Sequence, residues 1–258
     1  MASWATKRKA LYFFLFFAVL LFLIAIPGFL LLYEKPSCFD AKLNQGERGV
    51  DCGGPCAKLC KIDALAPSIL WARVLKVSPG VYNTVVLIEN PNLGLGAVDV
   101  SYLLKIYDPS NLLIYERKGK TSIPPGVIFP VFEGTITTAK RVASRATFEF
   151  VEQPSWRPYS EKRPEIRVSE TKLDGRDGQS FPKLSAVIEN RSSRPIPSFG
   201  VVAILTGISG NVVAASRTVV DVLPAESKAP AVFTWREPFV EDVVRVEIMP
   251  ELFPTIHY

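Results

Sequence analysis

Four cysteines within residues 38–60 carry the most distinctive side-chain chemistry of this chain. They are Cys38, Cys52, Cys56 and Cys60, in the spacing C-x13-C-x3-C-x3-C. Four thiols in one short segment either form two disulfides or bind a metal such as zinc. The C-x3-C spacing is looser than the C-x2-C of common zinc sites, and a redox-active C-x-x-C is absent from the sequence. We therefore expect two disulfides in an exported segment, with all three pairings open.

Oxygen ligands between these cysteines indicate a second chemistry. Asp40, Asn44, Glu47 and Asp51 lie in the same segment, and carboxylate and amide oxygens on a stapled loop can hold a weak calcium ion. Their spacing matches no EF-hand, and the same residue types commonly form turns. Two interpretations stay open: a calcium site, and a solvated loop with no cofactor.

Catalytic chemistry has few candidates elsewhere. His257 is the one histidine of the sequence and lies next to its last residue, where chain ends usually fray. No H-E-x-x-H, P-loop or G-x-G-x-x-G motif follows a suitable element. The stretch from Asp174 to Gly178 is similar to a calcium loop, although a β-turn explains it as well. We expect a protein that is not an enzyme, and we assign no catalytic residue.

An apolar segment is the first element that positions these groups. Residues Ala10 to Tyr33 carry no charge and follow Lys7, Arg8 and Lys9. Such a segment can cross a bilayer, which needs roughly 20 apolar residues, and a basic cluster prefers the cytoplasmic side. We expect a cytoplasmic tail at 1–9 and a signal anchor at 10–33, with the rest of the chain outside the cell membrane. A cleavable signal peptide is the alternative, although its apolar region is normally about 7–15 residues long.

An internal repeat organises the exterior region. Ile88-Glu89-Asn90 recurs as Ile188-Glu189-Asn190, Asn111-Leu112-Leu113 as Asn211-Val212-Val213, and Ile123-Pro124 as Leu223-Pro224, each time 100 residues later. This common register predicts two copies of one domain. Asn190-Arg191-Ser192 is also a glycosylation sequon, but its recurrence as Asn90-Pro91 favours a structural role at the end of a strand.

Each copy contains short runs of Val, Ile, Leu and aromatic residues that are separated by Pro, Gly, Asn and Asp turns. In the first copy we expect strands at 69–77, 83–89, 98–107, 112–117, 127–135 and 146–151. In the second we expect them at 166–173, 184–189, 199–205, 212–216, 232–235 and 243–248. The fold class is therefore mainly β, with a transmembrane helix followed by two tandem immunoglobulin-like sandwiches. The predicted domains are a Cys-rich segment at 34–65 and sandwiches at 66–155 and 163–258.

The net charge of +5 is modest, and the basic residues alternate with acids. Clusters such as Arg117-Lys118-Gly119-Lys120 are short, so solvated faces explain them better than a nucleic-acid groove does. Trp71, Trp156 and Trp235 are expected to pack in cores or at domain junctions. We expect no nucleic-acid partner.

The Cys-rich segment resembles a motif of exported, often membrane-anchored bacterial and archaeal proteins, with a pattern near C-x-D-G-x-x-N-x-x-E-x-x-x-D-C-G-G-x-C-x-x-C. The matching residues are Cys38, Asp40, Asn44, Glu47, Asp51, Cys52, Gly53, Gly54 and Cys56. Ala41 replaces the usual glycine, and one extra residue precedes Cys60. The resemblance implies an extracellular stapled module and no activity.

A second resemblance concerns the first sandwich. Leu104-Lys105-Ile106-Tyr107-Asp108, ahead of Ile123-Pro124-Pro125-Gly126, looks like the F-x-L-Y-D domain of bacterial envelope proteins and is similar to the late-embryogenesis-abundant water-stress sandwich. The second copy departs further, with Ile204-Leu205-Thr206-Gly207 at the corresponding place. Both families imply a fold and an extracytoplasmic location, without catalytic residues.

Two functions agree with these features. The first is a single-pass, membrane-anchored binding or scaffold protein of the cell envelope, whose partner is another envelope protein or polymer. The second is an extracytoplasmic protein that binds a lipid or another apolar ligand. An apolar cavity would favour the second function, whereas filled cores and an exposed strand edge would favour the first.

Overall fold

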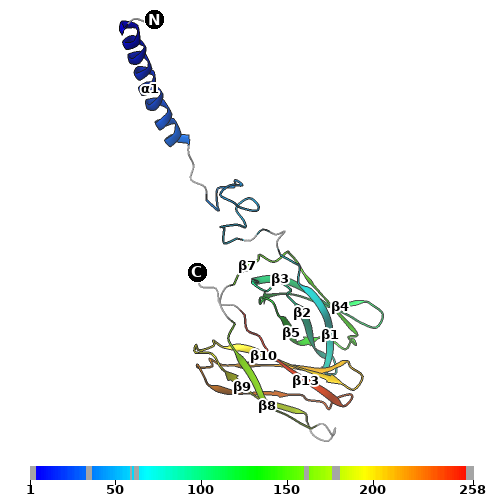
Figure 1. Cartoon of the computed structure of the whole chain (residues 1–258). Helices are drawn as coiled ribbons and strands as arrows, with labels where there is room; N and C mark the ends of the chain where they lie inside the picture. The colour runs from blue at the N-terminus through cyan, green and yellow to red at the C-terminus, as the bar shows by residue number, and fades with distance from the viewer. Residues whose placement is uncertain are drawn as a thin grey trace. The chain divides into compact units, whose positions relative to one another are not determined.

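A computed structural model describes residues 4–32, 37–58, 60, 64–159, 163–175 and 181–253 (Figure 1). The chain divides into two compact units, Met1–Cys56 and Ala57–Tyr258. Among the described residues, the first unit contains one helix and a loop without regular strands, and the second contains all of the strands. The fold is therefore mainly β with one apolar N-terminal helix, as the sequence predicts.

Helix α1 (Trp4–Leu32) accounts for the apolar segment. Its stretch Arg8–Gly28 has a mean hydropathy of 2.7 and is long and apolar enough to cross a membrane. Pro27 lies inside the helix, and neighbouring groups can satisfy the backbone carbonyl that a proline leaves free. At the first turn the Arg8 guanidinium lies 3.9 Å from the centre of the Trp4 ring. Tyr33, the predicted last residue of the anchor, is outside the described residues.

The first sandwich has two sheets around one core. Its strands are β1 (Ser68–Ser78), β2 (Val81–Glu89), β3 (Leu95–Tyr107), β4 (Leu113–Ile123), β5 (Ile128–Thr137) and β6 (Arg145–Phe150), with the short β7 (Arg157–Pro158). One sheet has the order β1-β2-β5, and the other has the order β4-β3-β6, with β7 paired to β3. Ile88, Leu104 and Ile106, each at most 1% exposed, lie in the core between the sheets.

The second sandwich repeats this strand order. Its strands are β8 (Ile166–Asp174), β9 (Lys183–Asn190), β10 (Phe199–Gly207), β11 (Val212–Val220), β12 (Lys228–Thr234) and β13 (Val243–Pro250). The sheets have the orders β12-β9-β8 and β11-β10-β13. If β8 to β13 are matched in sequence with β1 to β6, every strand has the same neighbours in both sandwiches. Leu184, Ile188 and Phe233, each at most 1% exposed, belong to its core.

Each of the twelve strand ranges predicted from the sequence overlaps one of these strands. The largest difference is β4, which continues to Ile123 although the prediction ends at Arg117. Its added part, Lys118 to Ser122, is polar or glycine, and pairing with β3 keeps it extended. The two-residue β7 was not predicted, because two residues show no periodicity.

A third apolar cluster lies between the two sandwiches. It consists of Leu75 and Val85 from the first sandwich and Val202, Ile204 and Ala215 from the second, all buried. Sheet β1-β2-β5 therefore packs with its outer face against the outer face of sheet β11-β10-β13. The result is a stack of four sheets within the unit Ala57–Tyr258.

Strand β10 lies inside this stack, and all nine of its residues are buried. Val201, Ala203 and Leu205 belong to the core of the second sandwich, whereas Val202 and Ile204 belong to the cluster between the sandwiches. Successive side chains of a strand point to opposite faces, so β10 contributes to two apolar layers. This explains why Val201 to Leu205 is an uninterrupted apolar run rather than an alternating one.

Candidate functional site

All four cysteines predicted to form disulfides do so. One bridge joins Cys38 to Cys56, with their Cα atoms 5.6 Å apart. Cys52 and Cys60 are disulfide-bonded as well, so the chain has two bridges and no free thiol. The prediction of two disulfides is confirmed. Of the three possible pairings, the structure has the one that contains the Cys38–Cys56 bridge.

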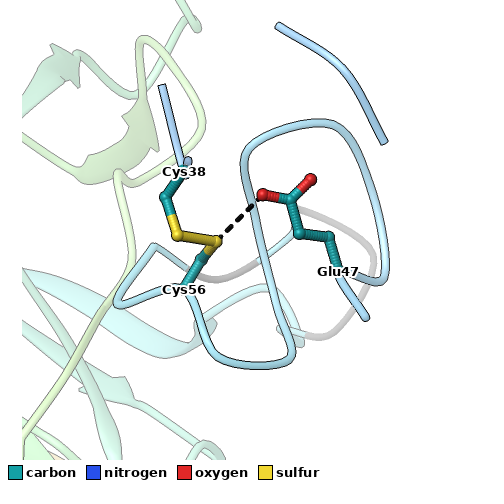
Figure 2. A group of neighbouring side chains, drawn as sticks. All are labelled: Cys38, Glu47 and Cys56. Carbon is teal, nitrogen blue, oxygen red and sulfur yellow. Dashed lines mark hydrogen bonds between the residues drawn. A yellow bond between two sulfur atoms is a disulfide. The ribbon is translucent and has the colours of Figure 1, made fainter. Parts of the chain in front are cut away.

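Glu47 lies beside this bridge (Figure 2). The ligand atoms of Cys38, Glu47 and Cys56 are within 4.8 Å of one another, and Glu47 Oε1 lies 3.0 Å from Cys56 Sγ. A metal would require thiolate ligands, and both sulfurs are joined to each other instead. In the oxidised protein this group is therefore a disulfide with a neighbouring carboxylate rather than a zinc site.

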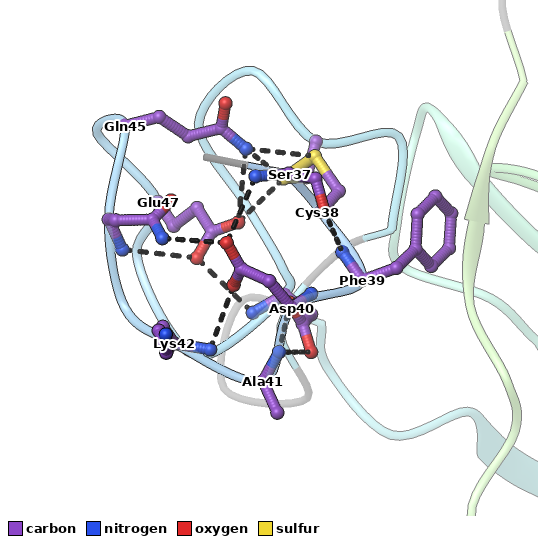
Figure 3. Close-up of a disulfide and its surroundings, with 11 residues drawn as sticks. Ser37, Cys38, Phe39, Asp40, Ala41, Lys42, Gln45 and Glu47 are labelled. Carbon is purple, nitrogen blue, oxygen red and sulfur yellow. Dashed lines mark hydrogen bonds between the residues drawn. A yellow bond between two sulfur atoms is a disulfide. The ribbon is translucent and has the colours of Figure 1, made fainter. Parts of the chain in front are cut away.

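The predicted calcium ligands fold the loop through hydrogen bonds to its own backbone (Figure 3). Asp40 Oδ2 accepts hydrogen bonds from the Ser37 N–H at 3.0 Å and from Asn44 Nδ2 at 2.9 Å, and Asp40 Oδ1 accepts one from the Lys42 N–H at 2.9 Å. The Asn44 amide, followed by the Ser37 N–H, lowers the pKa of Asp40 below its usual range. The Asp40 carboxylate thus holds a turn together.

Asp51 and Glu47 act in the same way. Asp51 Oδ1 accepts hydrogen bonds from the backbone N–H groups of Asp40 and Ala41, at 3.0 and 3.1 Å. Glu47 Oε2 accepts one from the N–H of Asp51 at 3.3 Å, while Asn44 Oδ1 is buried without a hydrogen-bond partner. The structure brings the four residues into one loop, but the carboxylates meet N–H donors. Calcium binding stays a prediction.

A second candidate site is a polar cleft of about 590 Å³ in the unit Ala57–Tyr258. No sequence motif indicated it. The first sandwich lines it with Asp99 and Tyr102 of β3, with 120–122 of β4 and with 130–135 of β5. The second sandwich contributes Arg217, Glu251 and Phe253. The cleft therefore lies where the open side of the first sandwich meets the second, and junctions between domains are common places for binding sites.

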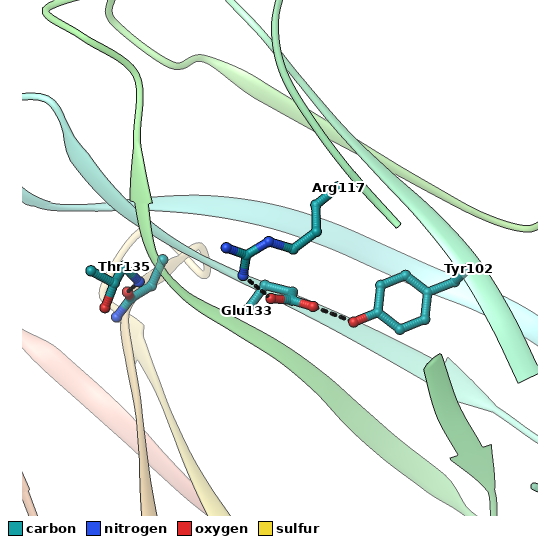
Figure 4. A network of polar contacts seen from close by, with 5 residues as sticks. Tyr102, Arg117, Glu133 and Thr135 are labelled. Atoms are coloured by element: carbon teal, nitrogen blue, oxygen red, sulfur yellow. Dashed lines mark hydrogen bonds and ion pairs between the residues drawn. The ribbon is translucent and has the colours of Figure 1, made fainter. Parts of the chain in front are cut away.

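A network of three side chains forms one wall of the cleft (Figure 4). The Tyr102 hydroxyl donates a hydrogen bond to Glu133 Oε1, and Arg117 Nη1 lies 2.5 Å from Glu133 Oε2. Burial of Tyr102, followed by its contact with Glu133, raises the pKa of this phenol above its usual range. The Tyr102 ring lies over Gly119 on the neighbouring strand, where a Cβ would come within 2.4 Å of the ring. The network connects the edge strands β4 and β5 through Arg117 and Glu133.

A second ion pair lines the opposite wall. Arg217 Nε lies 2.7 Å from Glu251 Oε2, and the Glu251 side chain is 8% exposed. The pair lies over Gly200 of β10, where a Cβ would come within 1.8 Å of Glu251 Oε2. Two of the three carboxylates that line the cleft, Glu133 and Glu251, are therefore neutralised by arginines, while Asp99 is the third. A side chain at position 200 would displace the ends of the Arg217 and Glu251 side chains.

Several other residues singled out in the sequence pack within the fold rather than line a site. Asn190 is fully buried, so its sequon is inaccessible in the folded domain. Trp71 packs against the cluster between the sandwiches, Trp156 against the first core and Trp235 against the second, as expected. His257 lies outside the described residues.

No model of a known protein family matches the chain, and no curated protein matches it. Among solved structures, the chain is similar to the crystal structure of red sea bream transglutaminase, with a TM-score of 0.23 and 11% sequence identity. The match covers 73% of this chain and 32% of that chain. A likeness of this size gives no information about activity.

Proposed function

We propose that this chain is a single-pass, membrane-anchored binding or scaffold protein of the cell envelope. Its two sandwiches, presented outside the membrane as one packed unit, hold a partner and catalyse no reaction. The observation that carries the proposal is the polar cleft, whose walls come from both sandwiches. Because an apolar cluster joins the sandwiches, the two walls stay in register without a ligand, and a preorganised site loses little entropy on binding.

Location is proposed from the first unit. A helix that is apolar over Arg8–Gly28 follows a basic cluster, which favours a cytoplasmic N-terminus. Two disulfides follow the helix, and disulfides persist in oxidising compartments. Together these features support an uncleaved anchor with an extracytoplasmic C-terminal region. The repeated strand order supports descent of both sandwiches from one repeated domain.

The alternative is an extracytoplasmic protein that binds a lipid or another apolar ligand. That function predicts an apolar cavity inside a sandwich. Large apolar side chains fill both cores, and Leu104, Ile106 and Phe233 are each at most 1% exposed. The cleft instead presents carboxylates, hydroxyl groups and a guanidinium. Binding of a polar partner is therefore the better-supported function.

Topology can be tested with a C-terminal epitope tag on the full chain. Protease added to intact cells or spheroplasts should remove the tag, while a cytoplasmic protein of the same cells stays intact. The tagged chain should also stay in the membrane fraction after a high-salt wash. Protection of the tag, or its release as a soluble mature form, would contradict the proposed anchor.

Binding can be tested by crosslinking in the native membrane. A photoreactive group at Thr135, which is exposed and lines the cleft, should yield one reproducible adduct. The same group at Lys172, an exposed residue of β8 in the second sandwich, is the control. Equal yields at both positions would contradict a cleft-centred binding function, as would a turnover activity of the purified protein that one substitution in the cleft abolishes.

A further inference from the structure

The cleft is lined by a continuous run of strand β5. Residues Pro130, Val131, Phe132, Glu133, Gly134 and Thr135 all border it. Side chains of a strand alternate between its two faces, so a cleft above one face would be lined by every second residue. Six consecutive residues mean that the cleft borders the edge of β5. This edge presents backbone groups, except that Pro130 has no N–H and the Thr135 N–H donates to Asn83 Oδ1 at 3.1 Å.

Strand β4 contributes its edge in the same way. Lys120, Thr121 and Ser122 are consecutive and all line the cleft. In the described sheets β4 and β5 each pair on one side only, β4 with β3 and β5 with β2. The backbone groups on the other side of an edge strand are available to a further strand.

We propose that the cleft binds an extended segment of a partner polypeptide, which adds to the edge of β5 as a further strand of sheet β1-β2-β5. This inference rests on the proposed binding function and names the class of partner. Six residues of β5 correspond to about 20 Å of extended chain, so a segment of about six residues is recognised. Backbone hydrogen bonds supply affinity, and alternate side chains supply specificity.

The two walls of the cleft determine which groups the side chains of the bound segment contact. Those that point into the first sandwich meet Tyr102 and the Glu133 carboxylate, which Arg117 already neutralises. Those that point the other way meet the Arg217–Glu251 pair and Phe253, which is 40% exposed. Both pairs are already neutral, and the exposed Asp99 and Lys120 add one charge of each sign to the lining. A segment without a strong net charge is therefore preferred over a strongly acidic or basic one.

A saccharide is the rival ligand for a polar cleft. It would use side-chain groups and, commonly, an exposed aromatic ring, which Phe253 could supply, but it has no regular series of backbone donors and acceptors to match the edge of a strand. The continuous lining by β5 and β4 therefore favours a polypeptide.

The probe is a library of linear 12-residue peptides displayed on phage, selected on the full chain reconstituted in lipid nanodiscs. Selected peptides are synthesised, and each is N-methylated at every second backbone amide, in two complementary sets. We expect one set to weaken binding at least tenfold and the other to leave it within about threefold, because only alternate amides of an added strand face β5. Equal effects of both sets would overturn strand addition.

The position at which the peptide binds is tested by hydrogen exchange and by matched variants. Peptide binding should slow exchange of backbone amides within 131–134, because Pro130 has no amide N–H and the Thr135 N–H already donates to Asn83 Oδ1. Lys120→Trp should obstruct the cleft and weaken binding at least tenfold. Lys118→Trp is the control, because Lys118 is exposed on the same strand and does not line the cleft. Thermal unfolding of both variants verifies their folding.

Two outcomes would overturn the inference. One is protection at another sheet edge with no effect of Lys120→Trp. The other is a library without binders together with a glycan array that gives a hit sensitive to Lys120→Trp. In either case the protease topology and the crosslinking of the native partner still decide the proposed function separately.

Discussion

Asn90 and Asn190 share two hydrogen bonds at equivalent positions of the two sandwiches, 100 residues apart. The Nδ2 group of Asn90 donates to the Pro124 carbonyl at 2.8 Å, and that of Asn190 donates to the Pro224 carbonyl at 2.9 Å. Their side chains are 1% and 0% exposed. Their backbone N–H groups donate to the carbonyls of residues 127 and 227, at 3.0 and 2.9 Å. Each asparagine thus joins the end of a strand to the turn before another strand.

Replacing Asn190 by Ala should lower the free energy of unfolding by about 2–4 kcal/mol, because buried carbonyls lose their donor. Asn190→Asp should cost at least as much, because a carboxylate would face the Arg194, Leu223 and Pro224 carbonyls that now accept from the amide. Urea unfolding of the reconstituted full chain measures both. Ser192→Ala, which removes one hydroxyl that contacts Asn190, should cost less. If Asn190→Ala and Ser192→Ala lowered the free energy of unfolding equally, the Asn190 side-chain amide would have no special role in stability.

Mass spectrometry of an unreduced digest should find Cys38 linked to Cys56. The two remaining cysteines, Cys52 and Cys60, should then be linked to each other. Closing a loop of this size stabilises a fold by about 3 kcal/mol, so reduction should loosen the stapled loop. Both sandwiches should stay folded, because neither contains a cysteine. Alkylation of a thiol without reductant, or stoichiometric zinc, would contradict the two bridges.

Arg117→Ala should lower the free energy of unfolding by about 1–3 kcal/mol, because it leaves the Glu133 carboxylate, 16% exposed, without its cation. A second change, Glu133→Gln, removes that charge and should restore part of the loss. Denaturant unfolding of the two single variants and the double variant gives the coupling between the residues. Additive losses would mean that the pair is not coupled in solution.

Alkaline pH should destabilise the protein through Tyr102, whose pKa is raised in the folded state, first by burial and then by Glu133. Well below a pH of about 10 the phenol is protonated in both states. At higher pH the unfolded chain loses this proton while the folded chain keeps it, so stability falls as pH rises. Tyr102→Phe should have a flatter stability profile above a pH of about 10, measured by denaturant unfolding. Identical slopes for both proteins would exclude this role of Tyr102.

Ile204→Ala should cost about 2–4 kcal/mol, because Ile204 is 1% exposed in the cluster between the sandwiches. Ile208→Ala is the matched control, since Ile208 is 72% exposed. Calorimetry of the native protein should give one transition for residues 57–258, with a lower midpoint in the Ile204 variant. Two separate transitions, with only the second lowered, would show that the sandwiches unfold independently.

The strand pattern and the cysteine chemistry could be predicted from the sequence, because both depend on local signals. Short runs of Val, Ile, Leu and aromatic residues between turns located the twelve strands, and four cysteines behind an apolar segment indicated disulfides. The 100-residue recurrence of Asn90 also indicated a structural role for Asn190 at the end of a strand, and the structure places both asparagines there, buried.

The cleft and the packing between sandwiches could not be predicted in the same way. Tyr102 and Glu251 belong to different domains, and no motif marks residues that meet only through the stacking of two sheets. One signal was available for the stacking itself. The unbroken apolar run Val201 to Leu205 departs from the alternation of a half-buried strand, and it indicated a strand covered on both faces. The function of Asp40 and Asp51 also depended on the loop conformation, since carboxylates on a loop can hold either a cation or backbone N–H groups.

The face-to-face packing of the sandwiches has a consequence for how the exterior is made. If the chain is exported during synthesis behind its N-terminal anchor, as proposed, the sheet containing Leu75 and Val85 emerges well before its cover, which includes Val202 and Ile204. At 5–20 residues per second this interval is on the order of 10 s. During that time the nascent protein is tethered and carries an uncovered apolar sheet, so periplasmic or extracellular holdases should be needed most just before β10 arrives.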